Sequence, residues 1–209
     1  MPVVSGSNSG ALAEALAAEL GWEHHPLEAR RFPDSEGYVR IPSHSIDAVR
    51  SEPVVIVATT FPDSGIVEAL LMLEAVHDVR SGDLKNLKGE GPEVLEASGP
   101  GIFLAVPYFG YSRQDKRFQG GEVISAALIV KLLAEHLDGL IVLDLHAPRV
   151  LEGLQTPVAF VSAMPEIAEH LREQVHPDFI LSPDKGAIER ASHVAKMIGC
   201  NFSYLEKIR

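Results

Sequence analysis

The sequence has little cysteine, no long apolar run and no leading signal pattern. Cys200 is the single cysteine among 209 residues, so no disulfide can form within the chain, which is typical of a reducing compartment. No apolar run approaches the roughly 20 residues of a membrane span. The first residues also lack a basic segment followed by an apolar one. These absences predict a cytoplasmic protein that does not enter a membrane.

Positive charge is scarce as well. The chain carries 18 Lys and Arg residues against 29 Asp and Glu residues, a net charge of −11. A surplus of this sign repels a phosphate backbone, so it argues against general nucleic-acid binding. A phosphorylated small molecule can still bind where local cations or a metal ion outweigh the overall field. The length is enough for a buried core in one or two domains.

Short apolar runs alternate with amphipathic stretches along the chain. Runs of strand length lie at 3–4, 54–59, 102–106, 140–145, 158–160 and 179–182. Helical spacing is found over 11–20, 65–79, 122–137, 165–173 and 187–199. In the first of these, Leu12, Leu16 and Leu20 share one face. The alternation predicts an α/β fold with a mainly parallel sheet covered on both faces by helices.

Two segments interrupt this pattern. Residues 81–101 hold five glycines among mixed charges, which predicts a surface loop or an insertion. The segment 148–157 begins and ends with proline and is the best candidate for a joint between domains. We therefore expect a first domain over residues 1–150 and a second that begins at residue 151 and runs to 209.

The most informative motif is Val-Pro-Tyr-Phe-Gly-Tyr-Ser-Arg-Gln-Asp-Lys-Arg-Phe at 106–118. It follows an apolar strand and precedes a helix, so Arg113, Gln114 and Asp115 lie in a strand-to-helix loop. Ligands bind at such junctions in α/β folds. Aromatic rings beside cations indicate a flat, anionic ligand. The alternative is a solvated run of charges, which these neighbours make less attractive.

Three further clusters place acids beside groups that bind ligands. Phe32, Asp34 and Glu36 combine an aromatic ring with two carboxylates, although these residues alone favour a solvated turn. Asp144 and His146 follow an apolar run, where strand alternation would aim both side chains to one face. There they would ligate a divalent metal, directly or through water, or orient one another. A hydrogen-bonded pair that ends the strand is the alternative.

The last cluster is Ser-Pro-Asp-Lys-Gly-Ala at 182–187. An acid follows a strand, and a glycine turn then opens a helix. Asp184 would hold a cation while Lys185 and the free backbone N–H groups of the helix start hold a phosphate. A simple helix cap by Asp184 explains the same residues equally well.

Together these motifs resemble the ribose-phosphate pyrophosphokinase family, also called phosphoribosyl pyrophosphate synthetases. The Pro-Tyr-Phe-Gly-Tyr-Ser-Arg-Gln-Asp run, Glu-Val-Ile-Ser-Ala, Asp-Leu-His-Ala and Ser-Pro-Asp-Lys-Gly-Ala occur in the family's order and approximate spacing. The Asp-Lys-Gly-Ala form resembles the archaeal branch. The resemblance implies two phosphoribosyltransferase-type domains, the second incomplete here, in a homo-oligomer such as a dimer. It implies transfer of the diphosphoryl group of ATP to ribose 5-phosphate, with Mg²⁺ required.

The resemblance also implies roles for particular residues. The first ATP motif, which reaches the adenine site of a neighbouring subunit in the family, is matched by Phe32, Asp34 and Glu36. The second ATP motif is matched by Arg113, Gln114 and Asp115. The positions tied to Mg²⁺ are matched by His146 and Asp184. The paired catalytic cations that open the family's flexible loop are matched by Lys207 and Arg209.

The sequence departs from the family in three places. Ser35 replaces a usual glycine, and the 81–101 segment is longer than expected. The chain also ends at Arg209, before the family's loop for the 5-phosphate of ribose. We therefore expect a piece of a full-length synthetase. The alternative is a non-catalytic homologue that binds nucleotide or assembles with active subunits, and a weaker one is a phosphoribosyltransferase.

Overall fold

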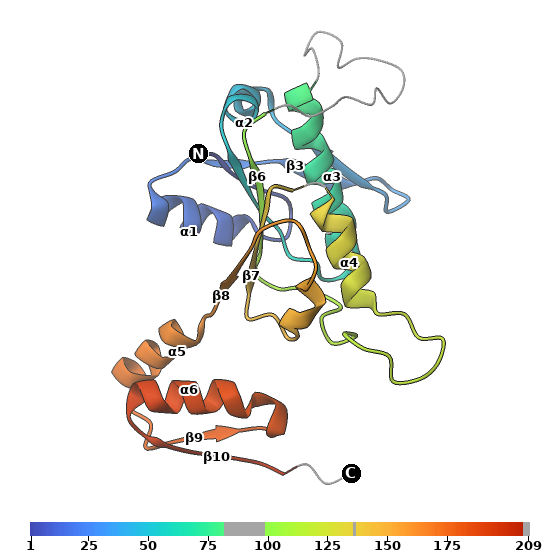
Figure 1. Ribbon diagram of the computed structural model, residues 1–209. Helices are drawn as coiled ribbons and strands as arrows, with labels where there is room; N and C mark the ends of the chain where they lie inside the picture. Colours follow the sequence, from blue (N-terminus) through green and yellow to red (C-terminus); the bar gives the residue numbers. More distant parts are fainter. Residues whose placement is uncertain (82–98, 136, 207–209) are drawn as a thin grey trace. The chain divides into compact units, whose positions relative to one another are not determined.

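The protein is described in a computed structural model that covers residues 1–81, 99–135 and 137–206 (Figure 1). Two compact units are present, Met1–Phe160 and Val161–Arg209. The division into family domains near residue 150 stays a prediction. Most of the 81–101 segment lies outside the described residues. Within the described part, no helix has the length and apolar character needed to cross a bilayer.

A six-stranded sheet forms the centre of the first unit. Its strands are β1 (Val3–Ser5), β2 (His24–Pro26), β5 (Val54–Val57), β6 (Ile102–Val106), β7 (Gly139–Leu143) and β8 (Val158–Val161). They lie in the order β2-β1-β5-β6-β7-β8. The pairs β1–β2, β1–β5, β5–β6 and β6–β7 are parallel. The carboxyl ends of these strands therefore meet at one edge, and the loops that follow them gather there.

Helices cover both faces of this sheet. The helix α1 (Gly10–Leu20) lies on one face, and α3 (Asp63–Ser81) and α4 (Ser125–Ala134) lie on the other (Figure 1). In β5, Val54 and Ile56 join the core under α3 and α4, whereas Val55 and Val57 join the core under α1. Burial on both faces is the reason that this strand is a continuous apolar run. The α/β prediction is confirmed.

The buried face of α1 differs from the leucine row seen in the sequence. Ala13 and Ala17 face the sheet and are at most 2% exposed. Leu12 and Leu20 are nearly half exposed, at 49% and 46%. The small alanines let the helix lie close to the strands, and of the leucine row only Leu16 packs against this core.

The first unit also contains a β-hairpin that the apolar pattern of the sequence did not predict. It consists of β3 (Glu28–Arg31) and β4 (Gly37–Arg40), which pair antiparallel. Its second strand packs on α3, and a Cβ atom at Gly37 would lie 3.1 Å from Cδ1 of Leu71. The glycine therefore permits the hairpin to approach the helix closely. The turn between the two strands contains the Phe32–Glu36 cluster.

A buried arginine fastens the opposite, amino edge of the sheet. Arg80 is 7% exposed and donates to backbone carbonyls of Val49 (3.0 Å), Glu52 (2.8 Å) and Pro100. Burial lowers the pKa of its guanidinium, and Asp138 partly opposes that shift. The carbonyls of Val49 and Glu52 lie at the end of α2 (Ile46–Ser51). One side chain thus links this helix, α3 and the segment that enters β6.

The second unit contains two helices and a two-stranded parallel sheet. Its elements are α5 (Met164–His170), β9 (Phe179–Ser182), α6 (Ile188–Ile198) and β10 (Asn201–Tyr204). The helix predicted over 165–173 ends at His170, where a π-helical turn over Leu171–Val175 follows. The helix α6 packs on both strands. The strand predicted over 179–182 is confirmed.

Candidate functional site

The loop that follows β6 leaves the sheet along a fixed path. The carbonyl of Tyr108 accepts from the Thr59 hydroxyl (3.1 Å) and from the Thr60 N–H (3.2 Å). The Gly110 N–H in turn donates to Oγ1 of Thr60 over 2.7 Å. A Cβ atom at Gly110 would lie 2.3 Å from the Thr60 carbonyl oxygen, so this close approach requires glycine. The loops after β5 and β6 therefore form one connected edge.

An open cavity lies at the same edge. Its volume is about 470 Å³, and it is lined by residues 7–12, 59, 107 and 108. The loop after β1 reaches it because Ser7 donates through its N–H and its hydroxyl to the Glu68 carboxylate, over 2.7 and 2.6 Å. The Glu68 carboxylate thus holds the β1 loop against α3.

The residues of the predicted second ATP motif come next along the loop after β6. Tyr111 has a left-handed backbone with φ of 62°, and its hydroxyl donates to Oδ1 of Asp63 over 2.7 Å. This hydrogen bond raises the pKa of the Tyr111 hydroxyl. The Gln114 N–H donates to the Tyr111 carbonyl (3.0 Å), and the Gln114 carbonyl accepts from Ala126 (3.3 Å) at the start of α4. Arg113 is exposed between these fixed points.

The carboxylate of Asp115 is paired with a residue that the sequence analysis did not select. Arg149, in the loop after β7, donates to Oδ2 of Asp115. Desolvation alone would raise the pKa of Asp115, but the hydrogen bond and charge of Arg149 lower the pKa overall. The Asp115 side chain is only 12% exposed, against 52% for Arg149. The pair therefore joins the loops that follow two neighbouring strands.

The Asp144 and His146 pair differs from the expected geometry. Strand β7 ends at Leu143, and Asp144 has a left-handed backbone with φ of 44°. The alternation that would put both side chains on one face therefore does not continue through these residues. His146 is exposed and Asp144 is partly buried. Both still lie in the loop at the carboxyl edge.

The Phe32–Glu36 cluster forms the tip of the β3–β4 hairpin. The Phe32 N–H donates to the Glu36 carbonyl (2.9 Å), and the Glu36 N–H donates to Oδ1 of Asp34 (3.1 Å). Ser35 has a φ of 75°, a conformation that favours glycine. Its carbonyl accepts from Arg31 over 2.8 Å. The unusual serine thus keeps the bend that a glycine would make easily.

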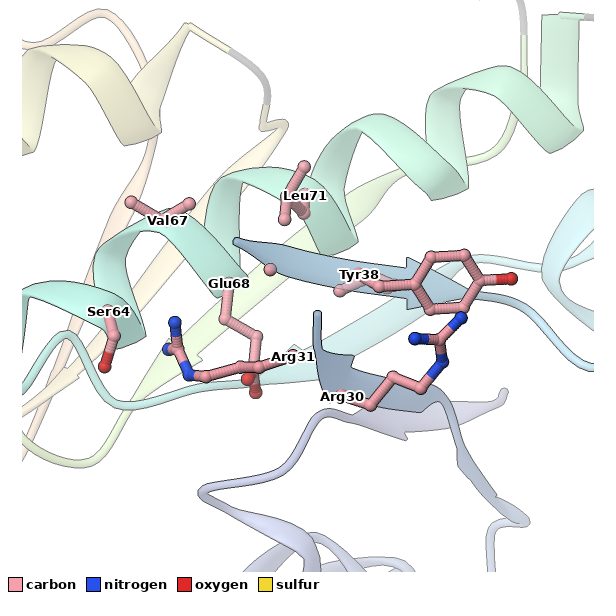
Figure 2. Close-up of a pocket in the computed structure, with 9 residues that line it drawn as sticks. Arg30, Arg31, Tyr38, Ser64, Val67, Glu68 and Leu71 are labelled. Atoms are coloured by element: carbon pink, nitrogen blue, oxygen red, sulfur yellow. The ribbon is translucent and has the colours of Figure 1, made fainter. Parts of the chain in front are cut away.

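The structure does not bring the two predicted ATP motifs together within one chain. The hairpin with its tip and the loop over residues 107–124 project as separate extensions of the first unit (Figure 1). Between the hairpin and α3 lies a small cavity of about 10 Å³, lined in part by Arg30, Tyr38 and Leu71 (Figure 2). The hairpin is therefore seated on its own helix and not on the loop that contains Arg113.

The Asp184 cluster lies in the second unit and acts as a helix cap. Oδ1 of Asp184 accepts from the N–H groups of Gly186 (2.9 Å) and Ala187 (3.2 Å). The Lys185 ammonium donates to Glu206 over 2.7 Å. The cap interpretation is confirmed, and the metal role of Asp184 stays a prediction. The predicted catalytic residues Lys207 and Arg209 lie outside the described residues.

In the part of the chain that the structure describes, side chains that bind metals do not gather in larger clusters. Within residues 1–81, 99–135 and 137–206, no group of three His, Cys, Asp or Glu side chains could hold a metal ion. Magnesium, however, commonly uses only one or two protein carboxylates together with waters and substrate phosphates. The available donors fit a metal ion held mainly by a phosphorylated ligand.

The residues that sequence reasoning missed were detectable in principle. Arg149 lies three positions after His146, in the loop of a strand that neighbours β6, so a parallel sheet would bring it to the same edge. Arg30 and Tyr38 flank the Phe32 cluster, and recognition of the hairpin would have paired them. Both signals become visible only when the neighbouring strands are known, and a single sequence does not specify the strand order.

Comparison with known proteins identifies the family. Residues 1–83 and 93–136 match the N-terminal domain of ribose phosphate pyrophosphokinase. A ribose-phosphate pyrophosphokinase from Methanothermobacter thermautotrophicus is 36% identical over 99% of this chain and 65% of its own length. One from Saccharolobus solfataricus is 34% identical over all of this chain and 65% of its own length. The predicted resemblance to the archaeal branch is confirmed.

A solved structure supports the fold independently. The phosphoribosylpyrophosphate synthetase of Mycobacterium smegmatis superposes with a TM-score of 0.76 at 24% identity, over 100% of this chain and 65% of its own. The chain therefore spans 65% of the length of each of these relatives. The family match covers more than half of the chain and both predicted ATP motifs. This chain belongs to the ribose-phosphate pyrophosphokinase family.

Proposed function

We propose that this protein transfers the diphosphoryl group of ATP to the 1-hydroxyl of ribose 5-phosphate. The observation that carries the proposal is the family match, which includes both ATP motifs. The hydroxyl oxygen attacks the β-phosphorus of ATP, and the bond from that phosphorus to the oxygen bridging the α-phosphorus breaks. The products are phosphoribosyl pyrophosphate and AMP, and the hydroxyl proton passes to solvent.

The chain's own residues supply position and charge. Arg113 and Gln114 bind the nucleotide from the loop after β6, and Asp115 fixes that loop through Arg149. The hairpin contributes Phe32 to the base, with Asp34 and Glu36 shaping the tip. Phosphoryl transfer needs mainly alignment and positive charge on the oxygens that gain negative charge.

The remaining roles fall to the metal site and the cationic pair. His146 in the first unit and Asp184 in the second are each assigned as a Mg²⁺ ligand, in part through water. When bound, the ion would supply positive charge that offsets the negative charge of the phosphates met by the attacking hydroxyl. Lys207 and Arg209 would stabilise the migrating diphosphoryl group. These assignments rest on the residues that match the family motifs.

We further propose a homo-oligomer in the cytoplasm, with family domains that meet near residue 150. The separate positions of the hairpin tip and the Arg113 loop support shared sites (Figure 1). If the hairpin of one subunit completes the site of another, mixing a Phe32→Ala chain with an Arg113→Ala chain should restore activity. Mixed oligomers would then contain some sites with both residues intact. Unchanged inactivity after mixing and reassembly would contradict the shared site.

The direct test is AMP formation from ATP and Mg²⁺ with and without ribose 5-phosphate. We expect AMP only when the sugar phosphate is present, and phosphoribosyl pyrophosphate in equal amount. Arg113→Ala should reduce the rate at least about tenfold, because a removed cationic clamp can cost ~10³ in such reactions. Lys131→Ala, at an exposed position of α4, is the matched control. The assay is made with the full-length protein, and absence of both products with the full-length wild type would refute the proposal.

A further inference from the structure

Three side chains of the β3–β4 hairpin form an aromatic and cationic cluster. Arg30 and Tyr38 are direct partners across the two strands. Phe32 lies two residues after Arg30, so the alternation of an extended chain brings it to the same face. Arg31, between them, instead donates to the Ser35 carbonyl. The sequence of the hairpin therefore gathers Arg30, Phe32 and Tyr38 on one side.

The geometry of this cluster holds the Phe32 ring. The Arg30 guanidinium carbon lies 4.7 Å from the centroid of the Phe32 ring and 4.2 Å from that of Tyr38. The two rings meet edge to face, with centroids 5.7 Å apart and an interplanar angle of 82°. Figure 2 shows Arg30 extended along the Tyr38 ring. Both contact types are attractive at these separations.

Phe32 keeps exposed surface for a ligand, since the residue is 39% exposed. Arg30 lies over one face of its ring, so a flat ligand would have to stack on the other face. A ring held by two neighbours loses less conformational freedom when a ligand stacks on it. Nucleobases stack on aromatic side chains irrespective of base identity because each base has a π face.

We propose that Arg30 and Tyr38 are positioning residues that hold the Phe32 ring for stacking on the base of the nucleotide. The choice of ATP as ligand rests on the proposed function. The inference goes further because it assigns roles to two residues outside the matched ATP motifs. It also separates recognition of the base from recognition of the phosphates.

The test compares ATP with inorganic triphosphate, which lacks the base. Binding of each, with Mg²⁺, is measured by titration of the chain while NMR signals of the Phe32 ring are followed. Arg30→Ala should weaken ATP binding about three- to tenfold, in line with the loss of two exposed cation–π contacts. Triphosphate binding should stay within about twofold. Arg30→Lys should restore part of the ATP affinity, since it keeps the cation.

Variants at Tyr38 test the ring contact separately. Tyr38→Phe keeps the ring and should bind ATP as the wild type does, whereas Tyr38→Leu should weaken binding about two- to fivefold. In both Arg30→Ala and Tyr38→Leu, the Phe32 ring signals of the free chain should shift. Arg40→Ala is the matched control because Arg40 forms its ion pair with Glu28 on the same hairpin. Equal melting temperatures would show that the hairpin remains folded.

Two results would overturn the inference. Equal weakening of ATP and triphosphate by Arg30→Ala would make Arg30 a phosphate ligand. No response of the Phe32 ring to ATP in the wild type would exclude stacking. The AMP assay separates this inference from the proposed function: a full-length protein that stacks ATP on Phe32 but forms no AMP supports the positioning role and refutes the reaction. In an active chain, Arg30→Ala should raise KM for ATP and leave kcat unchanged.

Discussion

The two edges of the central sheet are built differently. At the amino edge, the buried Arg80 guanidinium is held by three backbone carbonyls, and Asp138 accepts from the Ile102 N–H over 2.7 Å. At the carboxyl edge, Arg149 is half exposed in its pair with Asp115, and Arg113 is exposed. Buried polar groups with complete partners favour stability. Exposed charges on loops favour ligand binding.

This difference predicts that stability depends mainly on residues at the amino edge and activity mainly on residues at the carboxyl edge. Substitutions at the amino edge should lower the free energy of unfolding and spare ATP binding. Substitutions at the carboxyl edge should weaken ATP binding and leave the free energy of unfolding nearly unchanged, because loops near a ligand contribute little to the core.

Arg80→Met should have the largest effect. The methionine fills much of the same space but leaves the carbonyls of Val49, Glu52 and Pro100 without their donor. We expect a loss of about 3 kcal/mol in the free energy of unfolding, measured by urea denaturation. KM for ATP should be unchanged below the melting temperature.

Arg50→Met is the control for the Arg80 experiment. Arg50 is exposed on α2, so its substitution should change stability by no more than about 0.5 kcal/mol. A similar loss in both variants would mean that Arg80 acts only through general charge. A raised KM in Arg80→Met would break the separation between the two edges.

Arg149→Gln, at the carboxyl edge, should impair ATP binding more than stability. An exposed ion pair contributes little to stability, so the melting temperature should change slightly. The loop with Arg113 would lose its link to the loop after β7, and we expect KM for ATP to rise about tenfold, which corresponds to about 1.4 kcal/mol. The steady-state kinetics of AMP formation would measure this change.

A double-mutant cycle with Asp115→Asn shows whether the pair acts as a unit. If Asp115 works through Arg149, the double variant should lose no more than either single variant. Additive losses would mean that each side chain contacts the nucleotide by itself. Arg172→Gln is a suitable control because Arg172 pairs with Glu169 on the surface of the second unit.

The pH dependence of the same pair gives a smaller effect. The pKa of Asp115 is lowered in the folded chain from its ordinary value of 3.8. The ion pair therefore contributes fully above pH 3.8, and its contribution is lost as the pH falls through the lowered pKa. Titration of the Asp115 carboxyl carbon by NMR should show this low midpoint. Arg149→Gln should raise it and leave the midpoint of Glu28, which Arg40 lowers, unchanged.

Much of the fold could be predicted because it depends on local patterns. The strands β6 and β9 have the predicted bounds, since short apolar runs between turn residues are distinctive. The hairpin strands Glu28–Arg31 and Gly37–Arg40 are mostly polar and half exposed, so no apolar period identifies them. The buried face of α1 was also hidden, because Ala13 and Ala17 are less apolar than the leucines beside them.

The candidate site was predictable in its residue types and less so in its contacts. The motifs identified Arg113, Gln114 and Asp115, and the structure places all three in the loop after β6. The partner of Asp115 depends on which strand lies beside β6, and no local pattern gives that order. The left-handed backbone of Asp144 likewise ends the alternation that the sequence suggested.

Ser35→Gly should have the smallest effect and tests the hairpin tip. Ser35 has a φ of 75°, and a left-handed backbone costs a non-glycine residue about 1–2 kcal/mol. Glycine removes this strain but loses about 0.5–1 kcal/mol more backbone entropy on folding. We therefore expect a gain of only about 0.5 kcal/mol, measured by thermal unfolding, while Ser35→Ala should give no gain.

The tip variant also sharpens the comparison between the edges. Phe32 and Glu36 keep their backbone hydrogen bond across the turn, so Ser35→Gly should preserve the position of the Phe32 ring and ATP affinity within about twofold. If the affinity falls further without loss of stability, the restricted backbone of Ser35 itself helps to hold the ring. The tip would then resemble the Arg149–Asp115 link, in which a contact that adds little to stability fixes the position of a group that meets the ligand.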